Sequence, residues 1–397
     1  MICISRKTIS KKDKLHDNYT YKQKIQDALE QIKSGKKDKV TIILDNPNYL
    51  HNKSYLSKSY LRVLYNKIIY HVSRKITPSH FKNWLLNTTG MNIGYDACIP
   101  HNHVYDPYFP ELIHIGKGSI VGGCTTLLSH TLEDNKLVIG TVKIGERTLI
   151  GGMCTLYPGA SIGKNSLLTS DSELHTKIPD AEIWFGKPAK LVSKMDSVEL
   201  DKYFLPSNGK CEEYYKEYYD KLQTFKNDKT QSFFKIQYNG KHLNAGMDWW
   251  RARNIIGIFW SGFIVESTLN WKPSRFKNFI LRLTGAKIGK NVKIGKGVIL
   301  DHLLTNMITI EDNVVLEDNV YLDAHEYTIS QTIFGKTLVK KGAHIKSNVF
   351  TRAGTIVGEN SIIEENSFIS RVIPDNEIWS GQPAKCIRKL NETNKQE

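Results

Sequence analysis

A six-residue period of apolar side chains constrains the fold of this chain more than any other feature. The period runs through two stretches in the first half and through two matching stretches in the second half. Neither the 3.6-residue period of a helix nor the alternation of a strand explains it. A parallel β-helix does, because each hexad forms a short strand and a turn, and three hexads complete one coil. The repeating positions are Ile115, Val121, Leu127, Ile144, Ile150, Leu156, Ile162 and Leu168, then Ile310, Leu316, Leu322, Val339, Ile345, Thr351, Val357 and Ile363.

The same module occurs twice, at a constant offset of 195 residues. Phe81–Lys190 aligns without a gap with Phe276–Lys385, and 31 of the 110 aligned pairs are identical. The densest match closes each copy, as IPDAEIWFGKPAK and IPDNEIWSGQPAK. We therefore predict a mainly β protein with two tandem parallel β-helix domains and flanking α-helices.

These patterns divide the chain into four segments. We expect residues 1–54 to form a basic N-terminal tail with a short helix, and the part before about residue 40 to be poorly anchored because it lacks the hexads. Residues 55–195 are predicted to be the first β-helix domain with its leading helix. Residues 196–248 are predicted to be a helical linker, and residues 249–397 the second β-helix domain with its leading helix.

The hexad period is interrupted at the same place in both copies. Thr131–Thr141 and Glu326–Lys336 are expected to leave the coil as extended loops, and His130 and His325 stand at the loop entrances. In a regular solenoid, function is usually found at such an excursion. Asparagines are expected at tight corners that need a positive φ; they are Asn165, Asn313, Asn319 and Asn360.

The amino-acid composition and the net charge limit which kinds of partner this protein is expected to bind. The chain has 55 lysines and arginines against 40 acidic residues, a formal charge of +15, and 40% of its 397 residues are hydrophobic. These values are typical of a foldable soluble protein. The positive charge is accompanied by no zinc-finger spacing or aromatic RNA-binding motif, so no nucleic-acid partner is expected. An anionic cofactor, an anionic membrane surface or a simply solvated basic surface fits the charge.

Two observations favour a cytoplasmic protein. No apolar segment follows the basic N-terminus, so no signal peptide is expected there. The six cysteines are scattered without a Cys-x-x-Cys motif, which favours reduced thiols over disulfides or a zinc site. The apolar stretch Ile255–Val265 is shorter than the roughly 20 residues of a membrane span. We expect it to pack on the solenoid or on an oligomer partner, or to lie on the inner face of the membrane as a peripheral contact.

The hexads, the histidine before each loop, the stretch IGGMCTLYPGASIGKNSLL and the endings WFGKPAK and WSGQPAK resemble hexapeptide-repeat acyltransferases. The chain is similar to the sugar and polysaccharide O-acetyltransferases of that family. Its tandem arrangement also resembles the duplicated acyltransferase-like domains of poly-amino-acid synthetases. The resemblance implies left-handed coils, a homotrimer, and metal-independent transfer of an acetyl group from acetyl-CoA to a hydroxyl or amine of a sugar-type acceptor.

In this chemistry, His130 and His325 are candidate general bases. An imidazole that titrates near neutral pH can take the proton of an attacking hydroxyl. Asp106 and Asp301 each precede the histidine of their copy by 24 residues. They are candidates to orient the imidazoles, although an aspartate at such a place also serves a turn.

The resemblance also implies a set of cofactor-binding residues. Lys190 and Lys385 close the two endings and match the family position near the CoA phosphates. Gly151 and Gly152 would let the pantetheine arm approach the backbone closely, although glycine also suits a coil corner. The second copy has cations in the equivalent groove, which either bind phosphate or obstruct it; they are Lys346 and Arg352. The first copy is therefore expected to hold the working site.

Three other functions remain open at this point. Acyl or aminoacyl transfer from a carrier-protein thioester fits the basic surface as well as CoA does. A non-catalytic scaffold explains a degenerate second copy but not two retained histidines. A zinc-dependent carbonic anhydrase on this solenoid needs three histidine ligands. The first copy has His101, His103, His114 and His130, but the second copy lacks the first three of these.

Overall fold

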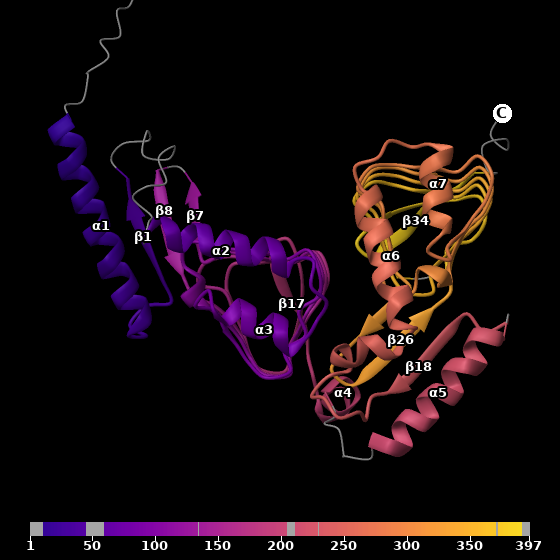
Figure 1. Cartoon of the computed structure of the whole chain (residues 1–397), viewed down its shortest axis with the longest axis horizontal. Coiled ribbons are helices and arrows are strands. Elements are labelled where there is room, and N and C mark those ends of the chain that lie inside the picture. The colour runs from indigo at the N-terminus through magenta and orange to yellow at the C-terminus, as the bar shows by residue number, and fades with distance from the viewer. Residues whose placement is uncertain are drawn as a thin grey trace, which may run out of the picture. The chain divides into compact units, whose positions relative to one another are not determined.

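The computed structural model describes residues 11–44, 59–133, 135–204, 211–228, 230–370 and 372–390, with side chains from residue 21 onward. The chain divides into two compact units, Met1–Leu205 and Pro206–Glu397 (Figure 1). Each unit is built around a stack of coils. The predicted mainly β class with flanking α-helices is confirmed.

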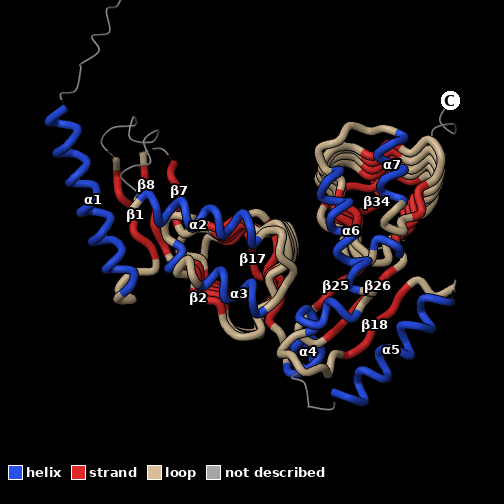
Figure 2. Tube along the Cα trace, viewed as in Figure 1, coloured by secondary structure: helices blue, strands red, loops and turns tan. Residues whose placement is uncertain are grey.

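Short parallel strands form the body of the first unit, and each coil adds one strand to each of three sheets (Figure 2). Leu149 pairs with Leu167 in the next coil, so an uninterrupted coil spans 18 residues, or three hexads. The strands are β2 (Asn92–Ile93), β3 (Val104–Tyr105), β4 (Ile113–Ile115), β5 (Ile120–Val121), β6 (Thr126–Leu127), β9 (Val142–Ile144), β10 (Leu149–Ile150), β11 (Thr155–Leu156), β12 (Ser161–Ile162), β13 (Leu167–Leu168), β14 (Glu173–Leu174), β15 (Lys177–Ile178) and β16 (Glu182–Gly186). An antiparallel strand, β17 (Ala189–Lys194), closes the stack, and helix α4 (Ser197–Phe204) follows it.

The second unit repeats this architecture in three further sheets. His344 pairs with Ile362, again 18 residues on. The strands are β19 (Lys287–Ile288), β20 (Lys293–Ile294), β21 (Ile299–Leu300), β22 (Ile308–Ile310), β23 (Val315–Leu316), β24 (Tyr321–Leu322), β27 (Thr337–Val339), β28 (His344–Ile345), β29 (Phe350–Thr351), β30 (Ile356–Val357), β31 (Ile362–Ile363), β32 (Phe368–Ile369), β33 (Glu377–Gly381) and β34 (Ala384–Lys389).

The hexad positions fill the interior of each stack, as predicted. Ile144, Ile150 and Leu156 are buried in one cluster with the other repeating residues of the first copy. Their counterparts Val339 and Ile345 lie in the core of the second unit. Burial of aliphatic side chains every sixth residue therefore stabilises the coils at about 25 cal/mol per Å² of apolar surface. The corner asparagines are also as predicted, with φ between 50° and 60° at Asn165, Asn313, Asn319 and Asn360.

The two excursions are β-hairpins, not the extended loops expected from the sequence. Strands β7 (His130–Glu133) and β8 (Lys136–Gly140) pair antiparallel in the first unit, and β25 (His325–Tyr327) and β26 (Gln331–Gly335) do so in the second. The physical reason is that antiparallel pairing satisfies the backbone groups of a segment that has left the coil. Each catalytic candidate histidine is the first residue of its hairpin.

Each hairpin carries a third strand and a helix from upstream in the chain. In the first unit, β1 (Lys39–Ile43) pairs with β8, and α1 (Lys11–Lys33) buries Tyr21, Ile25 and Ile32 against them. In the second unit, β18 (Phe233–Gln237) pairs with β26, and α5 (Cys211–Asn227) packs on that sheet. A helix-spaced apolar stripe makes this packing favourable.

This layer corrects two expectations from the sequence. We expected a poorly anchored segment before the first β-helix, and for residues 21–44 that is wrong, because its apolar side chains are buried against the hairpin. The segment 196–248, expected as a helical linker, supplies α5, β18 and the 3₁₀ segment Ala245–Arg251 to the core of the second unit. The expected tail and the expected linker are thus equivalent parts of two equivalent units.

Two helices lead into each stack: α2 (Tyr60–Ser73) and α3 (His80–Asn87), and α6 (Ile255–Thr268) and α7 (Arg275–Arg282). The repeated triplet FKN (Phe81 and Phe276) has a partial structural explanation in α3 and α7. The ammonium groups of the buried Lys82 and Lys277 donate to backbone carbonyls, and burial lowers the pKa of Lys277 to about 8. The side-chain amides of Asn83 and Asn278 donate to carbonyls of the first coil. Within the described ranges, no helix is long and apolar enough to cross a bilayer.

Candidate active site

The coil register brings Asp106 and His130 together in the first unit. Strand β3 pairs with β6, so the residue after β3 lies one coil below the start of the hairpin. The carboxylate of Asp106 accepts a hydrogen bond from the backbone N–H of Tyr108 (2.8 Å) and one from the Ser129 hydroxyl (2.7 Å). Its Oδ2 also accepts a short hydrogen bond from Nδ1 of His130. The aspartate therefore serves both a turn and the imidazole.

Aromatic side chains hold the His130 ring from the other sides. The rings of Tyr108 and Phe109 meet it edge-on, with centroids 5.4 and 5.6 Å away. With Nδ1 donating to a carboxylate, the neutral ring carries its lone pair on Nε2. No residue in the described part of the chain makes a hydrogen bond to Nε2, and the side chain is 18% exposed. Nε2 is therefore accessible to an acceptor hydroxyl.

His325 has the same partner and one more. Its Nδ1 donates to Oδ2 of Asp301 at 2.5 Å, and Oδ1 of Asp323 lies 3.5 Å from the same nitrogen. Asp301 is fixed by the backbone N–H groups of Leu303, Leu304 and Ala324, at 2.8, 2.9 and 2.8 Å. The second site thus contains two buried carboxylates beside one imidazole.

The extra carboxylate changes the protonation of the second site. Burial by itself lowers the pKa of His325, but the negative charge of Asp301 outweighs it and, with Asp323, raises the pKa to about 9. Burial and the charge of Asp301 raise the pKa of Asp323 well above its usual range. The imidazolium in turn lowers the pKa of Asp301 against the opposing effect of burial. At neutral pH, His325 is therefore a cation that lacks the lone pair a base needs.

Both cations predicted in the second groove are paired with carboxylates. Nζ of Lys346 donates to Glu364 at 2.6 Å, and this hydrogen bond raises the pKa of the lysine. The guanidinium of Arg352 makes a two-pronged contact with Glu326, with Nε 2.8 Å from Oε1. The first copy has Gly151, Thr169, Tyr157 and Thr131 at the four aligned positions. Both partners of each pair are thus particular to the second copy.

The predicted groove glycines of the first copy have a structural role. A Cβ on Gly151 would lie 2.3 Å from the backbone nitrogen of Ser170 in the next coil, so the stacking of coils excludes a side chain there. A Cβ on Gly152 would lie 3.2 Å from the carbonyl oxygen of Gly123, which is a milder restriction. Close coil packing thus accounts for Gly151 without any cofactor.

The predicted lysines of the two endings lie in the closing hairpins. Lys190 is opposite Phe185 in the β16–β17 pair, and Lys385 is opposite Ser380 in the β33–β34 pair. Both lysines are exposed. No contact recorded for the described residues joins either lysine to the histidine of its unit.

Sequence reasoning missed four side chains at these sites: Tyr108, Phe109, Ser129 and Asp323. The aligned copies contained a signal for the last of these, because Asp323 stands where the first copy has Leu128. The histidine set of the carbonic anhydrase alternative does not come together. His103 is fully buried, its Nε2 lies 3.2 Å from the carbonyl oxygen of Val121, and burial lowers its pKa to about 3. Among the described residues, none of the donor groups close enough to share an ion contains that set.

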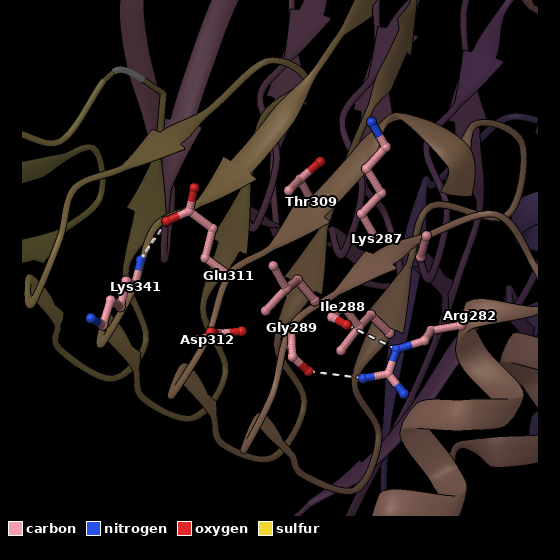
Figure 3. A pocket seen from close by; sticks show the side chains of 10 residues that line it. Arg282, Lys287, Ile288, Gly289, Thr309, Glu311, Asp312 and Lys341 are labelled. Carbon is pink, nitrogen blue, oxygen red and sulfur yellow. Dashed lines mark hydrogen bonds between the residues drawn. The ribbon is translucent and has the colours of Figure 1, made fainter.

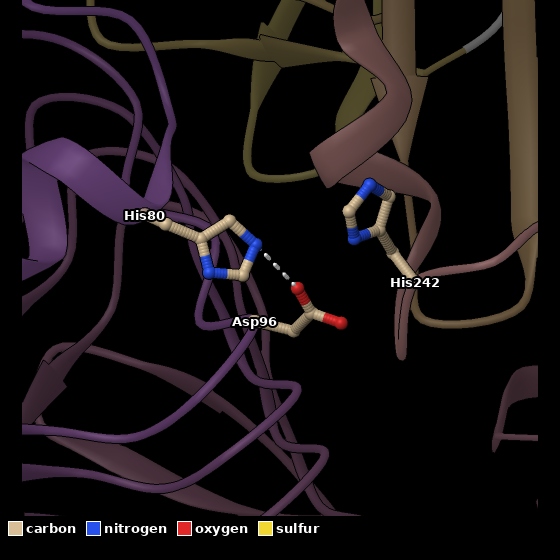
Figure 4. Close-up of side chains that lie close together, drawn as sticks. All are labelled: His80, Asp96 and His242. Carbon is tan, nitrogen blue, oxygen red and sulfur yellow. Dashed lines mark ion pairs between the residues drawn. The ribbon is translucent and has the colours of Figure 1, made fainter.

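Two other polar features lie outside the histidine sites. In the first unit, His80 at the start of α3 pairs with the buried Asp96 at 3.1 Å (Figure 4). In the second unit, an open depression of about 550 Å³ lies beside α7 (Figure 3). At the rim of the depression, the guanidinium of Arg282 donates hydrogen bonds to the carbonyls of Ile288 and Gly289. The carboxylate of Glu311 accepts a hydrogen bond from the backbone N–H of Lys341. We therefore do not treat the His80–Asp96 pair or the depression beside α7 as a candidate active site.

Comparison with known proteins places the chain in a family. The family model described as hexapeptide repeat of succinyl-transferase matches residues 141–169 and 285–324, one segment in each unit. "Putative acetyltransferase SAS0727" of Staphylococcus aureus is 33% identical over 147 residues, which are 35% of this chain and 89% of that protein. The chain belongs to the hexapeptide-repeat acetyltransferase family. The resemblance seen in the hexads and in the endings is confirmed.

Two further relatives and one structure complete the comparison of this hexapeptide-repeat protein. "Putative acetyltransferase YvoF" of Bacillus subtilis is 29% identical over 146 residues, 36% of this chain and 85% of that protein. The delta-poly-L-ornithine synthetase of Acinetobacter baumannii is 28% identical over 124 residues, 30% of this chain and 9% of that protein. A hexapeptide-repeat acetyltransferase from Vibrio cholerae, solved with acetyl-CoA, covers 36% of this chain and 91% of its own, with 17% identity and a TM-score of 0.29.

Proposed function

We propose that the protein transfers an acetyl group from acetyl-CoA to a hydroxyl or amine of a sugar-type acceptor, with His130 as the general base. One observation carries this proposal: Nδ1 of His130 donates a hydrogen bond to the carboxylate of Asp106, and Nε2 of the same ring stays accessible. Membership in the hexapeptide-repeat acetyltransferase family supports acetyl transfer as the reaction. The coils are proposed to be left-handed, as the family resemblance implies.

The chemistry follows from the geometry of the imidazole. Nε2 of His130 takes the proton of the acceptor as its oxygen or nitrogen attacks the thioester carbonyl. The carboxylate of Asp106 stabilises the imidazolium that forms and keeps the ring in its productive orientation. The tetrahedral oxyanion needs an N–H donor until the carbon–sulfur bond breaks. The imidazolium then returns its proton to the departing thiolate, so His130 ends neutral.

The donor is proposed to lie along the first stack, where Gly151 and Gly152 would let the pantetheine arm approach the backbone, as the resemblance implies. Lys190 and Lys385 are proposed to meet CoA phosphates, as the resemblance implies. Lys346 and Arg352 were candidates for the same role, but each would have to break its ion pair with a carboxylate before it could bind a phosphate. The second stack is therefore the weaker candidate for a CoA site.

We also propose a cytoplasmic homotrimer. One triangular stack offers only a shallow groove, and two adjacent stacks enclose a cofactor arm. Light scattering of the full chain at working concentration is expected to give three times the 45.3 kDa chain mass. A monomeric mass contradicts the trimer, and an assembly of fewer chains favours pairing of the two copies within the protein.

A second candidate function has one observation in its favour. The alternative is acyl or aminoacyl transfer from a carrier-protein thioester in place of free acetyl-CoA, and the name of the matched delta-poly-L-ornithine synthetase points to the joining of aminoacyl groups. The same base and orienting carboxylate serve both donors, because each presents a thioester carbonyl.

A thiol-release assay separates the two donors. The purified full chain is mixed with acetyl-CoA and a panel of sugars and amines, and free thiol is measured with and without each acceptor. Acceptor-dependent release that disappears in His130→Ala is the expected result. If no acceptor yields thiol from acetyl-CoA while a carrier-bound thioester is consumed, the donor assignment is wrong. The melting curve of His130→Ala must match that of the parent, so that lost activity is not caused by unfolding.

A further inference from the structure

The second unit exposes a continuous apolar face on its leading helices. On α6 the exposed side chains are spaced as one helical face, and they are Ile255, Ile256, Phe259, Trp260 and Phe263. On α7, Phe276 and Phe279 are also exposed. Ile256 is 74% exposed and Phe263 is 66% exposed. A contiguous apolar patch of this kind marks an interaction site rather than the scatter of single residues that every surface shows.

Within the described residues, the unit itself uses this face only at its margin, where Trp260 donates to the carbonyl of Leu283 at 3.1 Å and Phe259 meets Trp249 edge-on. Helix α6 contacts α7 and the coil strand β21, and α6 and α7 are seen beside the stack in Figure 1. On the opposite side of α6, Ile258, Ile264 and Val265 are buried in the core of the unit. In the FKN triplet, the lysine and the asparagine bond the first coil, whereas Phe276 points to solvent. Among the described residues of its unit, the Phe276 ring stacks only on Trp271, with centroids 5.7 Å apart, and more than half of the side chain stays exposed.

The first unit has the same face at the same aligned positions. On α2 and α3, the exposed apolar side chains include Leu61, Leu64, Ile68, Phe81 and Trp84. Phe81 and Phe276 are 59% and 61% exposed, and they are an identical pair at the offset of 195. A partner that both units contact accounts for apolar residues kept at exposed positions in two copies of one module.

The charges around both faces are almost all positive. Residues 59–94 contain no aspartate or glutamate, and Arg62, Lys67, Arg74 and Lys75 are exposed there. Residues 249–297 contain one acidic residue, Glu266, against ten lysines and arginines. Lys272 and Arg275 are exposed at the turn between α6 and α7, beside the apolar face. An occupant with negative charge next to apolar groups fits this composition.

We propose that the α6–α7 face, and in the same manner the α2–α3 face, docks on the surface of an anionic lipid bilayer. Phe, Trp and Ile side chains enter the boundary between headgroups and acyl chains, while the flanking cations meet lipid phosphates. Helix α6 has 14 residues, so it is about 21 Å long, shorter than the roughly 30 Å hydrocarbon core. The helix therefore lies in the surface. This inference does not depend on the proposed acetyl transfer.

Vesicle sedimentation of the full chain tests the proposal. The chain is expected to pellet with vesicles of phosphatidylcholine and phosphatidylglycerol, weakly with phosphatidylcholine alone, and less as salt is raised. The double variant Ile256→Glu/Phe263→Glu is expected to bind at least about tenfold more weakly. Leu61→Glu/Ile68→Glu tests the first-unit face in the same way.

A matched control introduces the same two charges elsewhere. Val192→Glu/Ile387→Glu changes two apolar side chains that are equally exposed but lie on β17 and β34. The control is expected to bind like the parent chain, and all variants to melt like it. The proposal is overturned if the parent does not bind vesicles or if Ile256→Glu/Phe263→Glu binds as tightly as the parent. Light scattering gives a further contradicting outcome. If the parent does not bind vesicles and Ile256→Glu/Phe263→Glu dissociates the oligomer into smaller species, a second copy of the chain covers the face.

Discussion

The two histidine sites sit on the same scaffold and differ in the number of carboxylates around the imidazole. His130 meets one carboxylate, that of Asp106, and two aromatic edges. His325 meets Asp301 and Asp323, with Glu326 contributing further negative charge. One substitution across the copies, Leu128 against Asp323, accounts for most of this difference.

The comparison shows that a histidine at the start of the hairpin is not a general base by its position alone. Both histidines begin a hairpin, and both donate Nδ1 to an aspartate one coil below. In the second site the charge of Asp301, with smaller contributions from Asp323 and Glu326, raises the pKa of His325 and so removes the lone pair that base catalysis uses. The groove differs in the same direction, because Lys346 and Arg352 form ion pairs where the first copy has Gly151 and Tyr157. We therefore infer that the second copy is specialised away from turnover.

Replacing the two histidines in turn is expected to have the largest effect. His130→Ala should lower turnover by about 10²–10⁴-fold, the usual cost of losing a general base. His325→Ala should leave turnover per mole of folded protein close to that of the parent. Steady-state assays with acetyl-CoA, alongside melting curves, measure both. The reverse pattern reassigns the active copy, and no effect of either change excludes the histidine mechanism.

Asp106→Asn is expected to reduce turnover by about 10²-fold or more. An amide facing Nδ1 donates to it, so the ring proton moves to Nε2 and the base is lost. The KM for acetyl-CoA should change little, and the loss should persist across the pH range. Asp301→Asn is the matched control and should leave turnover intact. A variant that turns over at the parental rate across the pH range would show that Asp106 serves only its turn.

The His325 site is expected to make the stability of the chain depend on pH by roughly 1 kcal/mol or more. The pKa of His325 is about 9 in the folded protein and ordinarily about 6.5, so folding takes up a proton. The stabilisation is complete below pH 6.5 and is lost as the pH rises through 9. Denaturant unfolding at pH 7 and pH 9.5 should show this loss in the parent chain.

Asp323→Leu introduces the residue of the first copy and is expected to flatten this pH dependence. The single remaining carboxylate stabilises the imidazolium less than two carboxylates do. A variant whose stability falls between pH 7 and pH 9.5 as steeply as that of the parent would rule out Asp323 as the cause.

The smallest effects are expected from the groove cations. Lys346→Ala and Arg352→Ala each break a partly exposed ion pair, which contributes little to stability because water screens the two charges. The KM for acetyl-CoA is expected to stay at the parental value, because both cations are occupied by carboxylates. A raised KM in either variant would instead show that these residues bind the donor.

Much of the site was predictable because the coil repeats. The 24-residue spacing put Asp106 roughly one coil below His130 and left its register open because the stretch between them is irregular, and in the structure the two side chains meet. The asparagines at the corners followed from the same reasoning, since a tight corner needs a positive φ. Lys346 and Glu364 are 18 residues apart and so lie in register on adjacent coils, but their ion pair was not predicted because the contact depends on side-chain direction.

The sequence by itself determined the coils, because their interior is recorded as a local period that each short strand carries. Only the tertiary structure decided what covers the hairpins. Lys39 pairs with Gly140 and Phe233 with Gly335, across about a hundred residues in each unit. An open hairpin edge accepts any short extended segment through backbone hydrogen bonds. Backbone pairing carries no side-chain signature, so the identity of the third strand emerges only when the whole chain has folded.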